Sequence, residues 1–174
     1  MTRIPGMRLL PWPGADGRPL YLSDTPAEGA RIVGRIADSV EVLRLGVGRA
    51  LLEQSPERLN AAAGDAERLR LFAVRLVRSL AEVITVAVCR GERVTAAAAD
   101  PDERQRLHMA RVLLGHALHL LMDPKVPCPQ ADFMVGRLIE SLADALRVAD
   151  RLGEQLRAGG DGDGGRHGGT GGAG

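Results

Sequence analysis

The stretch that decides the fold is PQADFMVGRLIESLADALRVADRLGEQLRAG, residues 129–159, because its apolar residues recur at alternating intervals of three and four. The residues in this repeat are Val135, Leu138, Leu142, Ala145, Ala149, Leu152 and Leu156. Such spacing places them on one face of an α-helix, and Gly159 is the kind of residue that ends one. The stretch therefore predicts a long amphipathic helix with an apolar seam suited to coiled-coil-like contact.

The earliest of three further predicted helices follows a proline-rich front segment. Thr25 stands as an N-cap, Pro26 occupies the first helical position and Glu28 completes a capping box. The apolar stripe expected to face the core consists of Ile32, Ile36, Val40, Leu43, Val47 and Leu51. Four glycines within this helix suggest close packing against another helix, or glycines that are merely tolerated at a cost in stability.

A second long helix is predicted from Asp65, as its cap, to Gly91. Its stripe consists of Leu69, Phe72, Leu76, Leu80, Val83 and Ala87. The segment VITVAVC, residues 83–89, is rich in β-branched residues and also suits a strand. Continuity with the preceding stripe favours the helix. Between these two helices, Ser55-Pro56 predicts one short helical turn that ends at Gly64.

A third long helix is predicted from Asp100-Pro101 to about Met122, where the prolines of DPKVPCP, residues 123–129, end it. Its stripe consists of Leu107, Ala110, Leu114, Ala117 and Leu121. Four amphipathic helices with short connections predict a mostly α chain that folds as an antiparallel four-helix bundle over residues 24–158. The glycine-rich segment 159–174 has too few apolar residues for a core and is expected to be disordered.

The front segment, residues 1–23, holds the only tryptophan and the only tyrosine of the chain. In MRLLPWPGADGRPLYLS, residues 7–23, two short apolar runs flank the turn signal Asp16-Gly17, which predicts a small β-hairpin or extended arm on the bundle. Trp12 and Tyr21 add large apolar area that the helices lack. Two interpretations stay open: a structural clasp, or an arm that docks a partner.

Composition restricts the function classes. The net charge of +1 gives no general attraction to nucleic acid or membranes, and no apolar run approaches the roughly 20 residues of a membrane span. The start of the chain lacks the pattern of a signal peptide, so a cytoplasmic location is expected. Of the two cysteines, Cys89 suits a buried thiol, whereas Cys128 at a helix start is a candidate reactive thiol.

Three histidines, His108, His116 and His119, fall within one arc of the third long helix and are weak metal-ligand candidates. The arc lies almost opposite the apolar stripe and contains no acidic residue or cysteine. Histidines that face solvent or a partner are therefore the favoured interpretation. No metal and no cofactor are predicted.

The second long helix carries Arg68, Arg75, Arg78 and Arg90 along one side, with Glu82 among them. Such a stripe suits contact with a partner or, less well, with phosphates. No aromatic residue accompanies it for base stacking, so a nucleic-acid role is disfavoured. No nucleophile-elbow, zinc-protease or phosphate-loop motif occurs in the chain, and no catalytic residue is predicted.

The order of the front segments resembles that of a group of small uncharacterised actinobacterial proteins. The resemblance covers about the first 95 residues and rests mainly on RLLPW, residues 8–12, and PLYLS, residues 19–23. It carries no activity over to this chain. It fits a basic complement in which every residue except Lys125 is arginine.

The sequence thus predicts a non-enzymatic helical interaction module, in a regulatory or adaptor role, that binds a protein partner or itself. The partner-binding candidates are Trp12, Tyr21, Arg68, Arg75 and Arg78. One alternative is a small-molecule or metal-binding bundle, with or without enzyme activity, that uses the histidine-bearing helix. A second is weak nucleic-acid binding through the arginine stripe.

Overall fold

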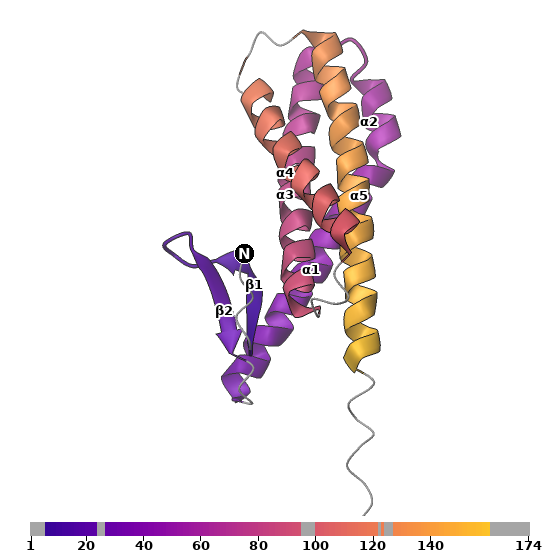
Figure 1. Ribbon diagram of the computed structural model, residues 1–174. Coiled ribbons are helices and arrows are strands. Elements are labelled where there is room, and N and C mark those ends of the chain that lie inside the picture. Colours follow the sequence, from indigo (N-terminus) through magenta and orange to yellow (C-terminus); the bar gives the residue numbers. More distant parts are fainter. Residues whose placement is uncertain (1–5, 24–26, 95–99, 122, 124–126, 161–174) are drawn as a thin grey trace, which may run out of the picture.

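The computed structural model describes residues 6–23, 27–94, 100–121, 123 and 127–160. Within these ranges the chain forms a two-stranded antiparallel sheet and five helices (Figure 1). The elements are β1 (Met7–Pro13), β2 (Pro19–Ser23), α1 (Glu28–Glu53), α2 (Ser55–Ala61), α3 (Ala66–Arg93), α4 (Pro101–Leu121) and α5 (Cys128–Gly160). The prediction of a mostly helical chain that starts with a short hairpin is confirmed.

Helix α3 is the centre of the core, since α1, α4, α5 and β1 all pack against it. Every residue of its predicted stripe is buried, and Leu76, Leu80 and Val83 are completely so. Asp65 caps the helix as predicted, because its carboxylate accepts hydrogen bonds from the backbone N–H groups of residues 67 and 68. The segment VITVAVC is helical, which confirms the choice of helix over strand.

The predicted end of this helix at Gly91 is wrong, because α3 continues to Arg93. A Cβ atom at Gly91 would lie 3.8 Å from a methyl group of Leu152 on α5. The glycine therefore faces a neighbouring helix, and it does not supply the left-handed turn that ends many helices.

The other two predicted seams also face the core. In α5, six of the seven repeat residues are buried and Leu156 is partly buried. In α4, Leu107, Ala110 and Ala117 are buried, and the two remaining residues of its stripe are partly buried. Helix α5 continues one residue beyond Gly159, and the rest of the predicted glycine-rich tail lies outside the described residues.

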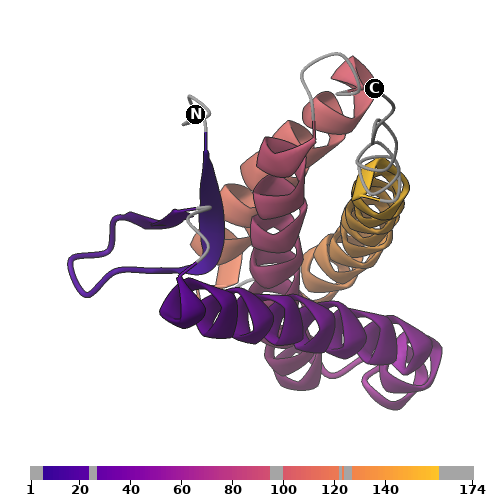
Figure 2. The same cartoon turned by 90° about the horizontal axis from the view of Figure 1, so that it is seen from below.

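Helix α1 does not follow its predicted orientation. Of the expected core stripe, Ile32, Ile36, Leu43 and Val47 are exposed. Figure 2 shows α1 along one side of the molecule, where it crosses α3. The helix begins at Glu28 after Ala27, while Thr25 and Pro26 of the predicted capping box lie outside the described residues.

The hairpin packs on α1 and α3. Arg8 of β1 lies opposite Leu22 of β2, and Leu9 lies opposite Tyr21. Gly17, with φ of +76°, supplies the left-handed turn that its place after Asp16 predicts. Leu9, Leu10 and Pro11 are buried, so the hairpin contributes directly to the core. Among the described helices, none combines the length and the apolar character that crossing a membrane requires.

Candidate interaction surface

The buried side of α1 centres on a carboxylate. Glu41 is only 2% exposed, and three arginines from two other elements reach it. Arg90 donates from Nε at 2.9 Å, Arg93 donates to both carboxylate oxygens at 2.8 and 2.9 Å, and Arg8 donates at 3.2 Å. These contacts join α1 to α3 and to β1. We refer to Glu41 and the three arginines as the Glu41 cluster.

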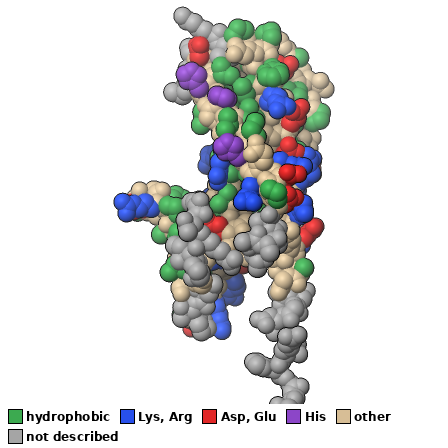
Figure 3. Space-filling view, in the orientation of Figure 1, with side chains coloured by type: hydrophobic (Ala, Val, Ile, Leu, Met, Phe, Trp, Pro, Cys, Tyr) green, Lys and Arg blue, Asp and Glu red, His purple; other side chains and the backbone are tan. Residues whose placement is uncertain are grey.

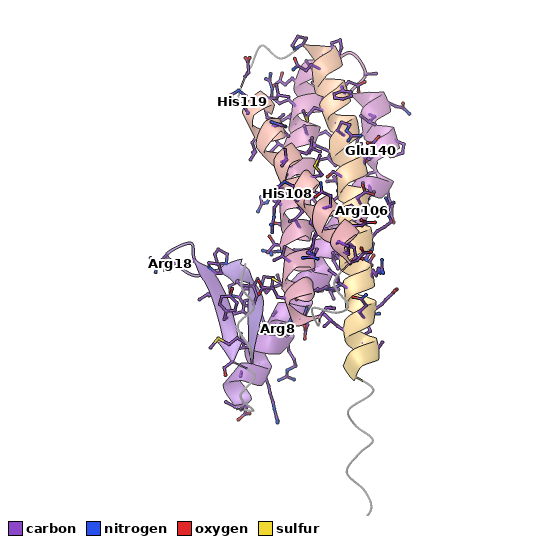
Figure 4. All side chains as sticks on the ribbon, in the orientation of Figure 1. Arg8, Arg18, Arg106, His108, His119 and Glu140 are labelled. Atoms are coloured by element: carbon purple, nitrogen blue, oxygen red, sulfur yellow. The ribbon has the colours of Figure 1, made fainter. Side chains whose placement is uncertain are left out.

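Further bonds complete the cluster. Arg90 donates to the backbone carbonyl of Ala149 on α5 at 2.8 Å, and Arg8 donates to Asp38 at 2.5 Å. Burial lowers the pKa of the Arg8 guanidinium, but the hydrogen bonds and negative charges of Asp38 and Glu41 together outweigh that effect and the net shift is upward. For Arg93, burial dominates and lowers the pKa. Figure 4 labels Arg8 where the hairpin meets α1.

Further along α1, the backbone at Gly48 packs closely against α3 and α5, on the same side of the helix as Glu41. A Cβ atom at Gly48 would lie 3.1 Å from Val83 on α3 and 3.5 Å from Leu146 on α5. Any side chain at this position would require Val83 to move by a few tenths of an ångström, so glycine suits this close approach. Together with Ala37 and Leu45, this position and Glu41 make up the buried face of α1.

The opposite side of α1 is apolar and faces solvent. The exposed fractions are 45% for Ile32, 50% for Ile36, 66% for Leu43 and 48% for Val47. At 100° per residue these four lie within one arc of about 60°. Val42, 66% exposed, flanks them. We refer to Ile32, Ile36, Leu43 and Val47 as the outer stripe.

The sequence around Glu41 gives no local signal for this orientation. A four-residue step joins Glu41 to Ala37, and another joins it to Leu45, so these residues form a second helical face that carries a carboxylate. Apolar periodicity alone gives that face no preference for the core. The three arginine partners stand at positions 8, 90 and 93, too far along the chain for a local pattern to reveal them.

Two of the predicted partner-binding arginines lie beside the outer stripe. Arg75 and Arg78 of α3 line a recess of about 480 Å³, together with Val47, Ala50 and Leu51 of α1. Arg78 also forms a 3.6 Å ion pair with Glu82. Arg68 does not line this recess; it pairs with Asp65 at 3.1 Å and donates to the carbonyl of Ala61. The prediction that Arg90 projects from the same side as these arginines is wrong, because Arg90 is buried and pairs with Glu41.

The two aromatic candidates lie on the hairpin. Trp12 is partly buried and lines a recess of about 350 Å³ between the hairpin and helices α1, α3 and α4. Arg44 and Arg111 line the same recess with apolar residues of β1 and α3. Arg44 also donates a hydrogen bond to the carbonyl of Pro11, which ties β1 to α1. Tyr21 is partly buried on β2.

The histidines lie on the solvent side of α4. His108, His116 and His119 are all exposed, and Figure 3 shows histidine side chains along this part of the surface. Figure 4 labels His108 and His119 on α4. Across the described ranges, no group of three or more histidine, cysteine or acidic side chains is arranged to hold a metal ion.

The two thiols occupy different environments. Cys89 on α3 is fully buried, and this burial raises the pKa of its thiol to about 12. Cys128, the first residue of α5, is partly exposed. A thiolate is the reactive form, so the protonated Cys89 thiol is chemically quiet at neutral pH.

No family model, curated protein or solved structure matches the chain.

Proposed function

We propose that this protein is a non-enzymatic interaction module, of the actinobacterial group that its front segments resemble, and that the outer stripe of α1 binds an apolar helix of a protein partner. The observation that carries the proposal is the exposure of four large aliphatic side chains on one face of α1. Apolar side chains gathered on one surface are typical of binding sites, whereas scattered ones are normal. A regulatory or adaptor role in the cytoplasm is part of the proposal.

The arrangement suits recognition of a helix. From Ile32 to Val47 the outer stripe spans about 22 Å along the axis, the length of four helical turns. An amphipathic helix that lies across it contacts side chains spaced three and four residues apart. We also propose that α1, α3, α4 and α5 form the antiparallel four-helix bundle, so that α1 presents one face to the bundle and the other to the partner.

The charges of the arginine stripe support a protein partner over nucleic acid. Arg68 pairs with Asp65, Arg78 with Glu82 and Arg90 with Glu41, so three of the four arginines lie beside a compensating carboxylate. Affinity for nucleic acid depends on cations that are free to neutralise phosphates. Within the proposal, Arg75 and Arg78 form the polar rim of the partner site.

A photo-crosslinking experiment tests the proposal. A benzophenone amino acid at Leu43, irradiated in the native host, is expected to give discrete cross-linked species. Those species should disappear when Ile36→Glu is added to the same chain. The matched control carries the probe at Leu71, an exposed apolar residue of α3. Absence of cross-links from position 43, or the same species from position 71, would overturn the proposal.

The recess beside Trp12 favours a second candidate function, which is the binding of a small molecule with an apolar chain and an anionic group. Its volume of about 350 Å³ lies at the lower end of the range for ligand pockets, and Trp12 provides an aromatic wall. The two cations Arg44 and Arg111 outnumber the one carboxylate of the recess, Glu82, which pairs with Arg78. The sequence predicts a small-molecule or metal-binding bundle as an alternative function. The candidate site uses Arg111 of the same histidine-bearing helix, α4, and needs no metal.

Trp12 reports directly on that candidate, because it is the only tryptophan of the chain. Decanoate is expected to change the tryptophan emission in a saturable way, and Arg111→Gln is expected to weaken the effect. Decyltrimethylammonium, of matched chain length and opposite charge, is the control. An equal response to both amphiphiles would exclude a charge-selective site.

A further inference from the structure

Two charged residues stand on the flank of the outer stripe. Arg35 and Glu53 are 18 residues apart, which is five full turns of an α-helix, so they lie on the same line along α1. About 27 Å of helix separates them. Both are exposed, and in the described part of the chain neither side chain forms an ion pair.

Along the sequence of α1, the midpoint between Arg35 and Glu53 nearly coincides with the midpoint of two pairs of apolar residues. Arg35 and Glu53 are centred on position 44. Val40 and Val47 are centred half a residue away, and so are Ile36 and Leu51, the last of which is half-buried at the edge of the outer stripe. Leu43, the most exposed member of the outer stripe, lies next to this centre. Charges and apolar residues are thus arranged about one point.

A two-fold axis through that point makes the surface complementary to itself. When such an axis relates two antiparallel helices, the same flank of each helix lies on the same side of the pair. A residue that precedes the axis in one copy then lies beside the residue that follows it by the same distance in the other copy. Arg35 of one copy then lies opposite Glu53 of the other, and this happens twice. The same operation sets Val40 against Val47 and Ile36 against Leu51, with the Leu43 side chains near the axis.

A parallel pair lacks these contacts. Each residue would lie level with its own copy, so about 27 Å of helix would still separate Arg35 from Glu53. Charge complementarity therefore selects the antiparallel arrangement. Ser39 and Gly46 lie on the same flank between the two charges, and a Cβ atom at Gly46 would contact nothing within 4 Å. These small residues allow a second helix to approach closely.

We propose that the outer stripe binds a second copy of this chain, with the two α1 helices antiparallel about an axis near Leu43. The inference rests on the proposed function and specifies its partner. An isologous dimer of this kind closes on itself and covers Ile36, Leu43 and Val47, whereas Ile32 lies beyond the end of the partner's α1. The apolar seam supplies the attraction, and the two Arg35–Glu53 pairs set direction and register.

The test is the molar mass of the full chain in solution, measured by light scattering over a wide range of concentrations. The wild-type chain is expected to be a dimer, and Leu43→Glu a monomer with an unchanged helical circular dichroism spectrum. A wild-type dimer that persists in Leu43→Glu would overturn the proposal, because it would place the interface elsewhere.

Charge reversal tests the register. Arg35→Glu and Glu53→Arg are each expected to weaken the dimer roughly tenfold, since each replaces two opposite-charge pairs by two like-charge pairs. The double variant Arg35→Glu/Glu53→Arg is expected to recover an affinity close to that of the wild type. The control Arg104→Glu reverses an exposed arginine of α4 and should leave the dimer unchanged. Failure of the double variant to recover would overturn the antiparallel register.

These outcomes separate the two proposals. A monomeric wild-type chain that still cross-links from position 43 to another protein would overturn self-association and leave the interaction module standing. A monomeric chain with no cross-link from position 43 would overturn both. Cross-linked species with twice the mass of the chain support both.

Discussion

Arg90 donates a 2.9 Å hydrogen bond from Nε to Oε2 of Glu41, and both side chains lie inside the protein. The bond joins α3 to α1 at a position where the helical pattern of α1 places a charged residue against the core. Arg93 and Arg8 share the same carboxylate. The Glu41 cluster therefore helps to fix the orientation of α1 that leaves the outer stripe exposed.

Removing the carboxylate should destabilise the fold. Glu41→Ala leaves the buried guanidinium of Arg90 without its counter-charge, and loss of one partner from a buried ion pair costs about 3–5 kcal/mol. Urea unfolding followed by circular dichroism measures the change. The control Asp144→Ala removes a solvent-exposed pair with Arg147 and should cost less than about 1 kcal/mol. Equal losses of unfolding free energy in the two variants would show that the Glu41 cluster stabilises the fold no more than an exposed ion pair does.

The close approach at Gly48 gives a second prediction. Gly48→Leu inserts a branched side chain where a Cβ atom alone lies 3.1 Å from Val83, and overpacking of this kind costs roughly 1–3 kcal/mol. Gly115→Ala on α4 has open space around the new methyl group and should stabilise by about 0.5–1 kcal/mol through helix propensity. Thermal unfolding of both variants checks the opposite signs.

The hairpin should unfold together with the helices. Leu9 is 5% exposed, and Leu9→Ala is expected to cost about 2–5 kcal/mol, as for other buried leucines. Trp12 emission reports on the hairpin and circular dichroism reports on the helices, so their urea transitions should coincide in the wild-type chain. An earlier transition of the tryptophan signal would show that the hairpin detaches independently and is no clasp.

Burial of Cys89 predicts differential thiol reactivity. With its pKa raised to about 12, Cys89 should resist a disulfide reagent such as DTNB at pH 8, while Cys128 reacts. One thiol equivalent is expected from the native chain and two after unfolding. Two rapid equivalents from the native chain would contradict the burial of Cys89.

The same shift gives a pH dependence of stability. The folded thiol binds its proton more tightly than the unfolded thiol, whose pKa is near 9.0. The contribution to stability is therefore fully present below about pH 9 and is lost as the pH rises toward 12. Cys89→Ala should flatten this part of the stability curve, which urea unfolding at a series of alkaline pH values measures.

The helices and the hairpin could be predicted because their signals are local. The repeats in α3 and α5 place one apolar residue on the core side at each turn, and the carboxylate of Asp65 caps the helix that follows it. Similarly, Asp16-Gly17 gives the hairpin turn. Gly91 misled the prediction because its role depends on Leu152, a residue of another helix.

The orientation of α1 could not be predicted for the same physical reason. The helix has an apolar face and a second face that carries Glu41, and periodicity favours burial of the first. The ion pairs with Arg90 and Arg93, together with close packing at Gly48, instead bury the second. The predicted arginine stripe is also divided: Arg75 and Arg78 line one recess, Arg68 pairs locally, and Arg90 is buried against Glu41.

The Glu41 cluster also affects the order in which segments fold during synthesis. Arg8 is synthesised before the helices, whereas two of its companions in the cluster, Arg90 and Arg93, belong to the end of α3. At about 5–20 residues per second, roughly 4–17 seconds pass before Arg93 is added to the nascent chain. During that interval the hairpin has no finished surface to rest on. The hairpin is therefore held in place only after the end of α3 has been made, and its docking is a later step than its synthesis.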